Sequence, residues 1–285
     1  PRPDGIYVDC TVGLGGHTAA LFAAGAGRVI GLDRDAGALA HAGDRLSAVG
    51  ARLELVHADY RDLPRVLGDR GVGAVDGVLA DLGVSSWQLD DPARGFSFRA
   101  SGPLDMRMDA STGPTAADLV ATADEVTLAD AIYRFGEERH SRRIARAIVR
   151  ARDRGPILDT GALASVVRAA AGGRGWQRID PATRTFQALR IWVNRELDGL
   201  DVFLESAVAA LGVGGRLAVI AFHSLEDRIV KHTFRRLTAD ETYARALTRK
   251  PIRPGEAEVE HNPRARSARL RAVELVRVNV HKVTA

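Results

Sequence analysis

A glycine-rich segment follows the first apolar run of the chain and has the composition of a ligand-binding turn. Residues 9–17 read D-C-T-V-G-L-G-G-H, and their glycines let the backbone turn tightly and approach a bound molecule closely. A second signal is Asp33, which ends the next apolar run 20 residues after Gly13. An acid at this place accepts hydrogen bonds from ribose hydroxyls. Together, the two features predict a site for a cofactor that contains adenosine.

The spacing within this segment separates the candidate cofactors. The dinucleotide-binding pattern needs glycine where the chain has Thr18, and no G-K-[ST] sequence follows for a nucleoside triphosphate. A loop that does not enclose a pyrophosphate suits S-adenosylmethionine (SAM), whose ammonium group could meet Asp9. Tyr60 could lie against the adenine ring, and Asp59 could bind its amino group. The simpler alternatives are a core aromatic residue at Tyr60 and a glycine turn without a ligand.

These polar residues are predicted to lie along one edge of a parallel sheet. Short apolar segments at 5–11, 28–32, 53–56 and 75–80 alternate with helical patterns such as 17–24 and 36–49. Strands and helices that alternate at this spacing form βαβ units, and ligands bind beyond the carboxyl ends of such strands. The polar residues that follow the strands are Asp9, Asp33, Asp59, Tyr60 and Asp81, and later in the chain His223 and Ser224.

The pattern changes after residue 83. Residues 83–111 are predicted to be a loop, and 114–172 show only helical patterns. A strand and a helix return at 216–222 and 225–237, and a polar loop at 240–269 precedes one or two edge strands at 270–280. The simplest architecture is a doubly wound, Rossmann-like α/β domain interrupted by an all-helical insertion. We place the first part of the core at 1–110, the insertion at 111–184, and the second part, with a basic C-terminal segment, at 185–285.

Composition excludes several classes of protein. The single cysteine, Cys10, rules out an intrachain disulfide, and eight scattered histidines make a catalytic metal unlikely. The longest apolar runs are far shorter than the roughly 20 residues of a membrane-spanning helix. A cytosolic protein without a membrane or metal partner is therefore expected, and the sequence leaves a homodimer open.

The net charge of +4 is unevenly distributed. Residues 1–110 hold 11 basic and 15 acidic side chains, whereas 111–285 hold 29 basic and 21 acidic ones. Two arginine runs stand out. Arg139, Arg142, Arg143, Arg146 and Arg150 have the spacing of one helix face, and Arg264, Arg266, Arg269 and Arg271 are predicted to cluster in a loop. Because the arginine fork binds phosphate well, these runs favour RNA as a partner over an ordinary solvated surface.

Several blocks of the chain resemble the bacterial RsmH (MraW) family. The blocks are D-L-G-V-S-S-W-Q-L-D at 81–90, R-G-F-S-F at 94–98, L-D-M-R-M-D at 104–109, E-R-H-S-R-R-I-A at 138–145, T-F-Q-A-L-R at 185–190, N-R-E-L at 194–197, F-H-S-L-E-D-R at 222–228 and N-P-R-A-R-S-A-R-L-R at 262–271. The resemblance spans essentially the whole chain. It implies a class I SAM-dependent methyltransferase that acts on the N4 amine of a cytosine in 16S rRNA of the small ribosomal subunit. It also implies SAM contacts at Gly15, Gly16, His17, Asp33, Tyr60, Asp81 and Gln88.

Asp81 is the first candidate for the catalytic residue. The lone pair of a cytosine amine is delocalised into the ring, so an acceptor for one N–H would favour attack and later receive the proton. Many amino-methyltransferases carry D/N-P-P-Y/F at this place, whereas this chain has D-L-G-V. Asp81 could therefore contact SAM, the base or both, and Trp87 or Phe96 could supply the missing stacking face. Further polar candidates near the edge are Asp105, Arg107, His223 and Ser224.

Three other functions stay open at this point. The enzyme could methylate another nucleic acid or a small molecule, although the arginine runs argue against a small substrate. An NAD-dependent oxidoreductase conflicts with Thr18 in the glycine loop. A ribosome-assembly factor with a SAM pocket but no activity is the non-enzymatic alternative. We assign substrate RNA contacts to Arg139, Arg142, Arg143, Arg264 and Arg266.

Overall fold

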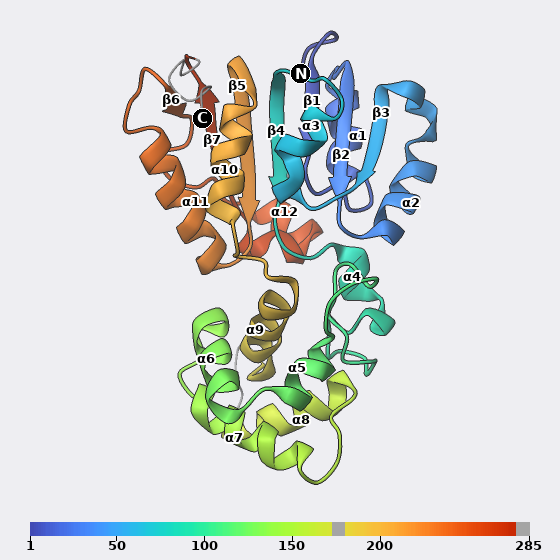
Figure 1. Cartoon of the computed structure of the whole chain (residues 1–285), viewed down its shortest axis with the longest axis vertical. Coiled ribbons are helices and arrows are strands. Elements are labelled where there is room, and N and C mark those ends of the chain that lie inside the picture. Colours follow the sequence, from blue (N-terminus) through green and yellow to red (C-terminus); the bar gives the residue numbers. More distant parts are fainter. Residues whose placement is uncertain (173–179, 278–285) are drawn as a thin grey trace. The chain divides into compact units, whose positions relative to one another are not determined.

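The computed structural model describes residues 1–172 and 180–277 and divides the chain into two compact units (Figure 1). The first unit comprises Pro1–Gly83 and the described residues from Leu197 onward, and the second is Val84–Glu196. No helix in the described residues is both long and apolar enough to cross a membrane.

The first unit is built on a seven-stranded sheet with the order β3-β2-β1-β4-β5-β7-β6. Its parallel strands are β1 (Ile6–Asp9), β2 (Arg28–Asp33), β3 (Leu53–His57), β4 (Val75–Asp81) and β5 (Leu211–Ala221). β7 (Arg269–Leu275) lies antiparallel between β5 and the short β6 (Ala244–Ala246). The predicted α/β fold with a doubly wound sheet is confirmed.

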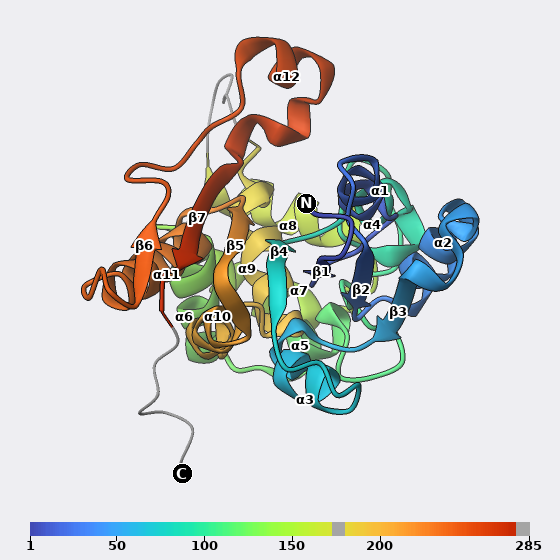
Figure 2. The same cartoon turned by 90° about the horizontal axis from the view of Figure 1, so that it is seen from above.

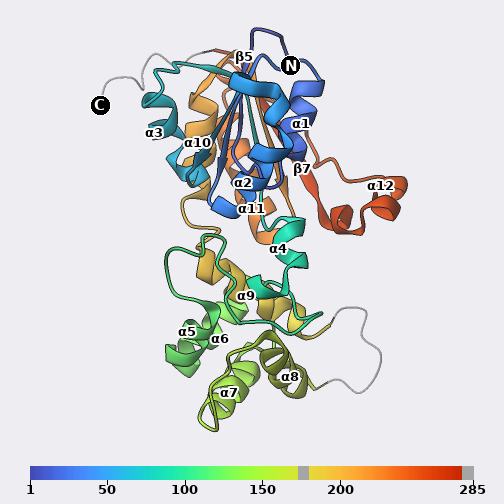
Figure 3. The same ribbon diagram turned by 90° about the vertical axis from the view of Figure 1, so that its right-hand side faces the viewer.

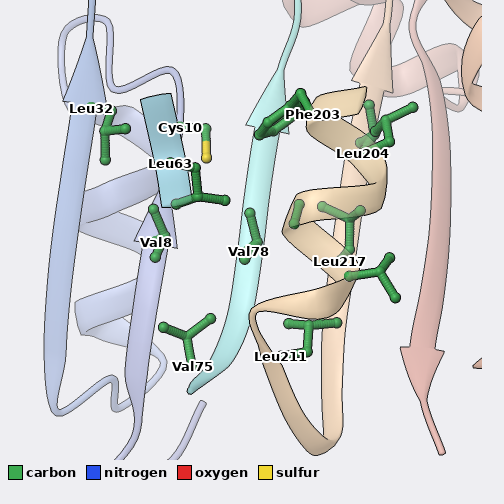
Figure 4. Packing of buried hydrophobic residues seen from close by; sticks show 14 of the residues in the cluster. Val8, Cys10, Leu32, Leu63, Val75, Val78, Phe203, Leu204, Leu211 and Leu217 are labelled. Atoms are coloured by element: carbon green, nitrogen blue, oxygen red, sulfur yellow. The ribbon is translucent and has the colours of Figure 1, made fainter. Parts of the chain in front are cut away.

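Helices cover both faces of this sheet, and Figure 3 shows α1 on one side with α3 and α10 on the other. On one face, α1 (Gly16–Ala23) and α2 (Ala36–Arg45) pack against β1, β2 and β3. On the other face lie α3 (Leu63–Gly68), α10 (Leu200–Ala209) and α11 (Ser224–Leu237). The side chains of Leu63, Val78, Phe203 and Leu217 show how these helices meet the strands in the largest apolar cluster (Figure 4). Burial of this apolar area is the main force that holds the sheet and the helices together.

The second unit consists of helices around a separate apolar core. The helices are α4 (Ser86–Asp90), α5 (Ala116–Thr122), α6 (Glu125–Gly136), α7 (Ser141–Arg152), α8 (Thr160–Ala171) and α9 (Ala182–Asn194). Phe96, Leu104, Met106 and Met108 are buried in this core, although they lie outside any helix. The boundaries expected at 111 and 184 thus fall inside the second unit. That its helices form an inserted domain for the substrate stays a prediction.

Asn194 fastens the segment around Met106 to α9. Its Nδ2 donates to the carbonyl oxygen of Met106, and its Oδ1 accepts from the amide of Met108, both at 2.7 Å. Met106 has a φ of 63°, which is unusual for a residue with a side chain. The two hydrogen bonds from one buried amide group hold this turn in place. The sequence pattern does not predict these two hydrogen bonds, because Asn194 is far along the chain from Met106 and Met108.

Two predicted loops contain regular structure. Residues 83–111 include α4 and a 3₁₀ turn at Pro92–Arg94. Residues 240–269 include β6, α12 (Glu256–His261) and a 3₁₀ turn at Pro263–Ser267, and Figure 2 shows α12 standing out beyond β7. None of the α12 residues is buried, so this helix has no apolar stripe from which it could be predicted.

The prediction that the second arginine run lies in a loop was wrong in part, because Arg269 and Arg271 lie in β7. The Nε of Arg271 donates to Oδ1 of Asp227 on α11 at 2.7 Å, and Arg269 donates to Oδ2 at 3.0 Å. Burial alone would raise the pKa of Asp227, but the two guanidinium groups hold it below its usual value. These arginines therefore join β7 to α11. The last part of the expected edge strand, residues 278–280, lies outside the described residues.

We expect Asp227→Ala to lower the free energy of unfolding by about 3 kcal/mol, because it leaves the Arg271 charge largely buried without its partner. Urea unfolding measures this change. Glu241→Ala removes an exposed acid and serves as the control, with an expected change within about 0.5 kcal/mol. Equal stability of the two variants would contradict a structural role for the ion pair.

Candidate active site

The acids predicted at the sheet edge do lie there together. β1, β2 and β4 are parallel, and Asp9, Asp33 and Asp81 are their last residues. Their carboxyl ends therefore meet at one edge of the sheet, which is where open α/β sheets bind ligands.

The glycine loop between β1 and α1 has the backbone that only glycine adopts readily. Gly13 has a φ of 51°, and Gly15, the N-cap of α1, has a φ of 78°. A Cβ on Gly15 would lie 2.8 Å from the side chain of Leu46, whereas one on Gly16 would meet nothing within 4 Å. No side chain caps α1, and its first turn carries no acid. The loop therefore presents free backbone amides and open space at Gly16, a combination suited to a carboxylate.

The glycine loop holds the side chain of Asp33 by a backbone hydrogen bond. Its Oδ2 accepts from the amide of Gly13 at 2.7 Å, and its Oδ1 accepts from the amide of Asp35 at 2.9 Å. Burial raises the pKa of Asp33, and the two amide donors oppose this shift. Each carboxylate oxygen can accept a further hydrogen bond, so the side chain is oriented for a pair of hydroxyls.

Asp9 is fully buried at the end of β1. Its Oδ2 accepts from the hydroxyl of Thr18 at 2.7 Å, and its Oδ1 accepts from the amide of Thr11 at 3.2 Å. Burial raises the pKa of Asp9 from 3.8 to about 6, although both hydrogen bonds and nearby His17 oppose the shift. Because ionising this buried carboxyl group is unfavourable, a cationic ligand beside it would stabilise its charged form.

The raised pKa predicts how stability depends on pH in the protein without ligand. An acid whose folded pKa exceeds its unfolded pKa contributes stability at low pH, and this contribution is lost as the pH rises through about 6. Asp9→Asn avoids the buried charge. We expect it to match the wild-type protein below about pH 4 and to be more stable by up to about 3 kcal/mol at about pH 8. Thermal unfolding across this range measures the difference, and a gap that does not change with pH would contradict the assignment.

Asp81 and His17 face each other across the loop. His17 Nε2 lies 3.2 Å from Oδ2 of Asp81, and this contact raises the pKa of the imidazole against the opposing effect of burial. The hydroxyl of Thr11 accepts from the amide of Asp81 at 2.7 Å. The other carboxylate oxygen, Oδ1, is buried and has no hydrogen-bond partner among the described residues. It is therefore the oriented acceptor that a bound group would satisfy.

Tyr60 and Asp59 have partners of their own. The Tyr60 ring packs against Phe203 with 4.6 Å between centroids, so part of its surface belongs to the core. Asp59 accepts from Arg61 at 2.7 and 2.8 Å and lies 3.6 Å from Nε of Arg34. Although burial would raise the pKa of Asp59, these contacts hold it below its usual value. The adenine contacts of both residues stay predictions.

His223 caps α11. Its Nδ1 accepts from the amide of Glu226 at 3.4 Å, and the Glu226 side chain accepts in return from the amide of His223. His223 Nε2 also lies 3.1 Å from Oε1 of Glu226, and Ser224 opens the helix. This geometry is a reason to assign His223 a structural role first. A catalytic role for His223 or Ser224 stays a prediction.

The other predicted contacts lie in different places. Gln88 belongs to the second unit, where it closes a capping box with Ser85 at the start of α4. The predicted RNA contacts Arg139, Arg142 and Arg143 are exposed in the second unit, and Arg264 and Arg266 are exposed in the first. Their contacts with SAM and RNA stay predictions.

Comparisons with known proteins decide the family. The family model of the MraW methylase family matches residues 1–276. The chain belongs to the MraW methylase family. It is 54% identical to ribosomal RNA small subunit methyltransferase H of Sorangium cellulosum over 97% of this chain and 86% of that protein. The proteins of the same name from Nitrobacter winogradskyi and Syntrophobacter fumaroxidans are 52% and 51% identical, over 96% of this chain and 86% and 91% of those proteins.

Family membership confirms that this MraW-family chain is a methyltransferase with a class I fold and that SAM is its cofactor. The residues at the sheet edge fit SAM. Asp33 offers acceptors for ribose hydroxyls, Asp9 is a buried anion for the ammonium group, and the amides at Gly16 suit the carboxylate. The unpartnered Oδ1 of Asp81 completes the set of polar groups at this edge.

Two residues of this MraW-family site were missed from the sequence. Thr18 counted only as a departure from the dinucleotide pattern, but it is fully buried and its hydroxyl holds Asp9. Arg61 holds Asp59 and also donates to the carbonyl oxygen of Asp198. Thr18 could have been predicted from the sequence. It places a hydroxyl on the buried face of the helix that follows a strand ending in an acid.

Proposed function

We propose that this chain transfers a methyl group from SAM to the N4 amine of a cytosine in 16S rRNA of the small ribosomal subunit. Its curated relatives at about 50% identity carry the name ribosomal RNA small subunit methyltransferase H. The structural observation that carries the proposal is the buried, unpartnered Oδ1 of Asp81 beside the glycine loop. The cytoplasm, where ribosomes are assembled, is the expected place of action.

The first task of the protein is to hold and orient the cofactor. SAM supplies an electrophilic methyl group on a sulfonium that is its own leaving group. Asp33 and the glycine loop orient the ribose and the methionine end, while Asp9 attracts the ammonium group. Positioning of the two reactants contributes most of the catalysis in such a transfer.

The second task falls to Asp81. His17 holds Oδ2, which leaves Oδ1 to accept a hydrogen bond from one N–H of the cytosine amine. This hydrogen bond draws the amine away from conjugation with the ring and makes its lone pair available. After transfer, the same oxygen receives the proton that the amine must lose.

The base has to leave its stack before it reaches the site. Contacts with phosphates elsewhere on the RNA then hold the rest of the substrate. Arg139, Arg142 and Arg143 in the second unit and Arg264 and Arg266 in the first are exposed and suited to this task.

Mass spectrometry of 16S rRNA from cells with and without the gene tests this function. We expect one N4-methylated cytosine to lose its methyl group upon deletion and to regain it when the purified chain and SAM are added to deficient subunits. Unchanged methylation of every cytosine upon deletion would overturn the proposal. Complementation of the deletion by an Asp33→Ala variant without methylation would instead indicate an assembly factor.

A further inference from the structure

One end of the second unit brings together four ends of its longest helices. α6 ends at Gly136 and α7 begins at Ser141, while α8 ends at Ala171 and α9 begins at Ala182. A Cβ on Gly136 would lie 2.5 Å from the carbonyl oxygen of Arg184, and Arg184 donates to the carbonyl of Glu137 at 3.4 Å. Arg143 donates to the carbonyl of Ala171. These contacts bring the four helix ends together, and we call this region the basic end.

The basic end carries more positive charge than its acids balance. Its arginines are Arg134, Arg139, Arg142, Arg143, Arg168 and Arg184, and its acids are Asp130, Glu137, Glu138 and Asp180. Asp180 pairs with Arg168 at 2.8 Å, and Glu138 lies 3.7 Å from Arg184. The other four arginines form no ion pair with any described residue, and all four are exposed. Exposed guanidinium groups without an acidic partner are suited to a polyanion, including that of Arg143, which also donates to the carbonyl of Ala171.

Two of the arginines farther along α7 are used within the unit. Arg146 lies 3.3 Å from the carboxylate of Glu125, and Arg152 donates to the carbonyls of Val120 and Ala123 at 2.6 Å. The predicted stripe along α7 is therefore not uniform. The exposed arginines that have no acidic partner among the described residues cluster at the start of α7, next to Arg139, while Arg150 lies near its far end.

An exposed aromatic ring lies on the last turns of α6, the helix that ends at the basic end. Tyr133 is 61% exposed, whereas its neighbours Leu128, Ile132 and Gly136 on α6 are buried. It precedes Gly136 by three residues, so the two are about 4.5 Å apart along the helix axis. Arg134 follows it directly and lies over the ring of Phe135 at 5.8 Å. An exposed ring on a helix that leads into a cluster of arginines without acidic partners has the chemistry of a surface that stacks an unpaired base.

We propose that the basic end docks a single-stranded segment of the RNA substrate, with Tyr133 stacking on one base and Arg139, Arg142 and Arg143 binding the adjoining phosphates. This inference rests on the proposed function and deepens it. It assigns Tyr133 to substrate binding and narrows the predicted arginine stripe to Arg142 and Arg143 at the start of α7, next to Arg139. Single strands fit better than duplex, because only unpaired bases expose a face for stacking.

Fluorescence anisotropy with a short single-stranded RNA and its duplex, using the full chain, tests the surface. We expect Tyr133→Ala to weaken single-strand binding by about tenfold and Tyr133→Phe to bind nearly as well as wild type, because stacking needs the ring face. The double variant Arg142→Gln/Arg143→Gln should make the salt dependence of log affinity less steep by about 1.4. Arg150→Gln, an exposed arginine at the far end of α7, is the matched control and should bind like wild type.

Several outcomes would overturn the inference. One is that both Tyr133→Ala and the double arginine variant bind single-stranded RNA with wild-type affinity. Another is that Arg150→Gln loses as much affinity as the double variant, which would indicate a non-specific attraction between RNA and the positive charge of the unit. If the variants bound free RNA normally but bound the ribosomal subunit poorly, the surface would contact a protein instead. Unchanged SAM affinity in each variant serves as the test of folding.

Different results would contradict the proposed function and the proposed docking surface. If wild-type chain methylates 16S rRNA and Tyr133→Ala leaves KM for the subunit unchanged, the docking surface is wrong and the function stands. If no cytosine of 16S rRNA depends on the gene, yet Tyr133→Ala still weakens binding to single-stranded RNA, the function is wrong and the surface stands.

Discussion

Asp81→Asn should lower kcat for methylation of the small subunit by about a hundredfold. The asparagine keeps the shape of the side chain, but it loses the negative charge and the basicity that the departing proton requires. Oδ1 is buried and has no hydrogen-bond partner in the described part of the chain, while Oδ2 is engaged by His17, so no other oxygen of this side chain is available to replace it. Single-turnover methylation of subunits at saturating SAM measures the effect on the chemical step.

Asp76→Asn is the matched control, because Asp76 lies on the same strand, β4, several residues before its carboxyl end. Its carboxylate accepts from the amide of Ile6 at 2.8 Å and pairs with Arg2, so it serves the sheet and not the site. We expect this variant to methylate at the wild-type rate. If Asp81→Asn weakened SAM binding but kept the wild-type kcat, the carboxylate would be a cofactor contact alone and the proton would have another acceptor.

Asp33→Ala should raise the dissociation constant of SAM by about a hundredfold, which corresponds to about 3 kcal/mol for two charge-assisted hydrogen bonds. The variant loses the expected acceptors for the ribose, and it also frees the amides of Gly13 and Asp35 that the carboxylate holds. The glycine loop should then lose its fixed position. Isothermal titration calorimetry measures the affinity, and the free energy of unfolding is followed in parallel.

Asp35→Asn is a close control for this variant. Asp35 caps α2 by accepting from the amides of Gly37 and Ala38, and asparagine caps helices as well as aspartate does. The control removes one acid two residues away from Asp33, and it should bind SAM like the wild-type protein. Equal weakening of SAM binding in both variants would mean that net charge and not the geometry of Asp33 determines affinity.

The parallel strands of the sheet could be predicted because each contains a short apolar run followed by a turn or an acid. The predicted segments at 28–32, 53–56 and 75–80 fall within one residue of β2, β3 and β4. Strands buried on both faces need continuous apolar sequence, and this signal is local. The helix α12 and the strand β6 could not be predicted in this way, since neither presents an apolar face of its own.

The acids of the site could be predicted for the same reason, because parallel strands bring their carboxyl ends to one edge. Their partners could not. The hydroxyl of Thr18, the guanidinium of Arg61 and the imidazole of His17 each hold one of these carboxylates. Which donor reaches which oxygen depends on side-chain directions within the folded unit.

The sequence by itself determined the family, the α/β class and the acids expected to bind SAM, because family-specific blocks and short apolar runs are properties of neighbouring residues. Only the tertiary structure decided which arginines have an acidic partner. Arg271 is paired with Asp227, a residue 44 positions away, and Arg146 with Glu125, whereas Arg139 and Arg142 have no acidic partner among the described residues. An ion pair forms between charges that folding brings within a few ångströms, and residue spacing along one helix contains no information on a partner that comes from another element.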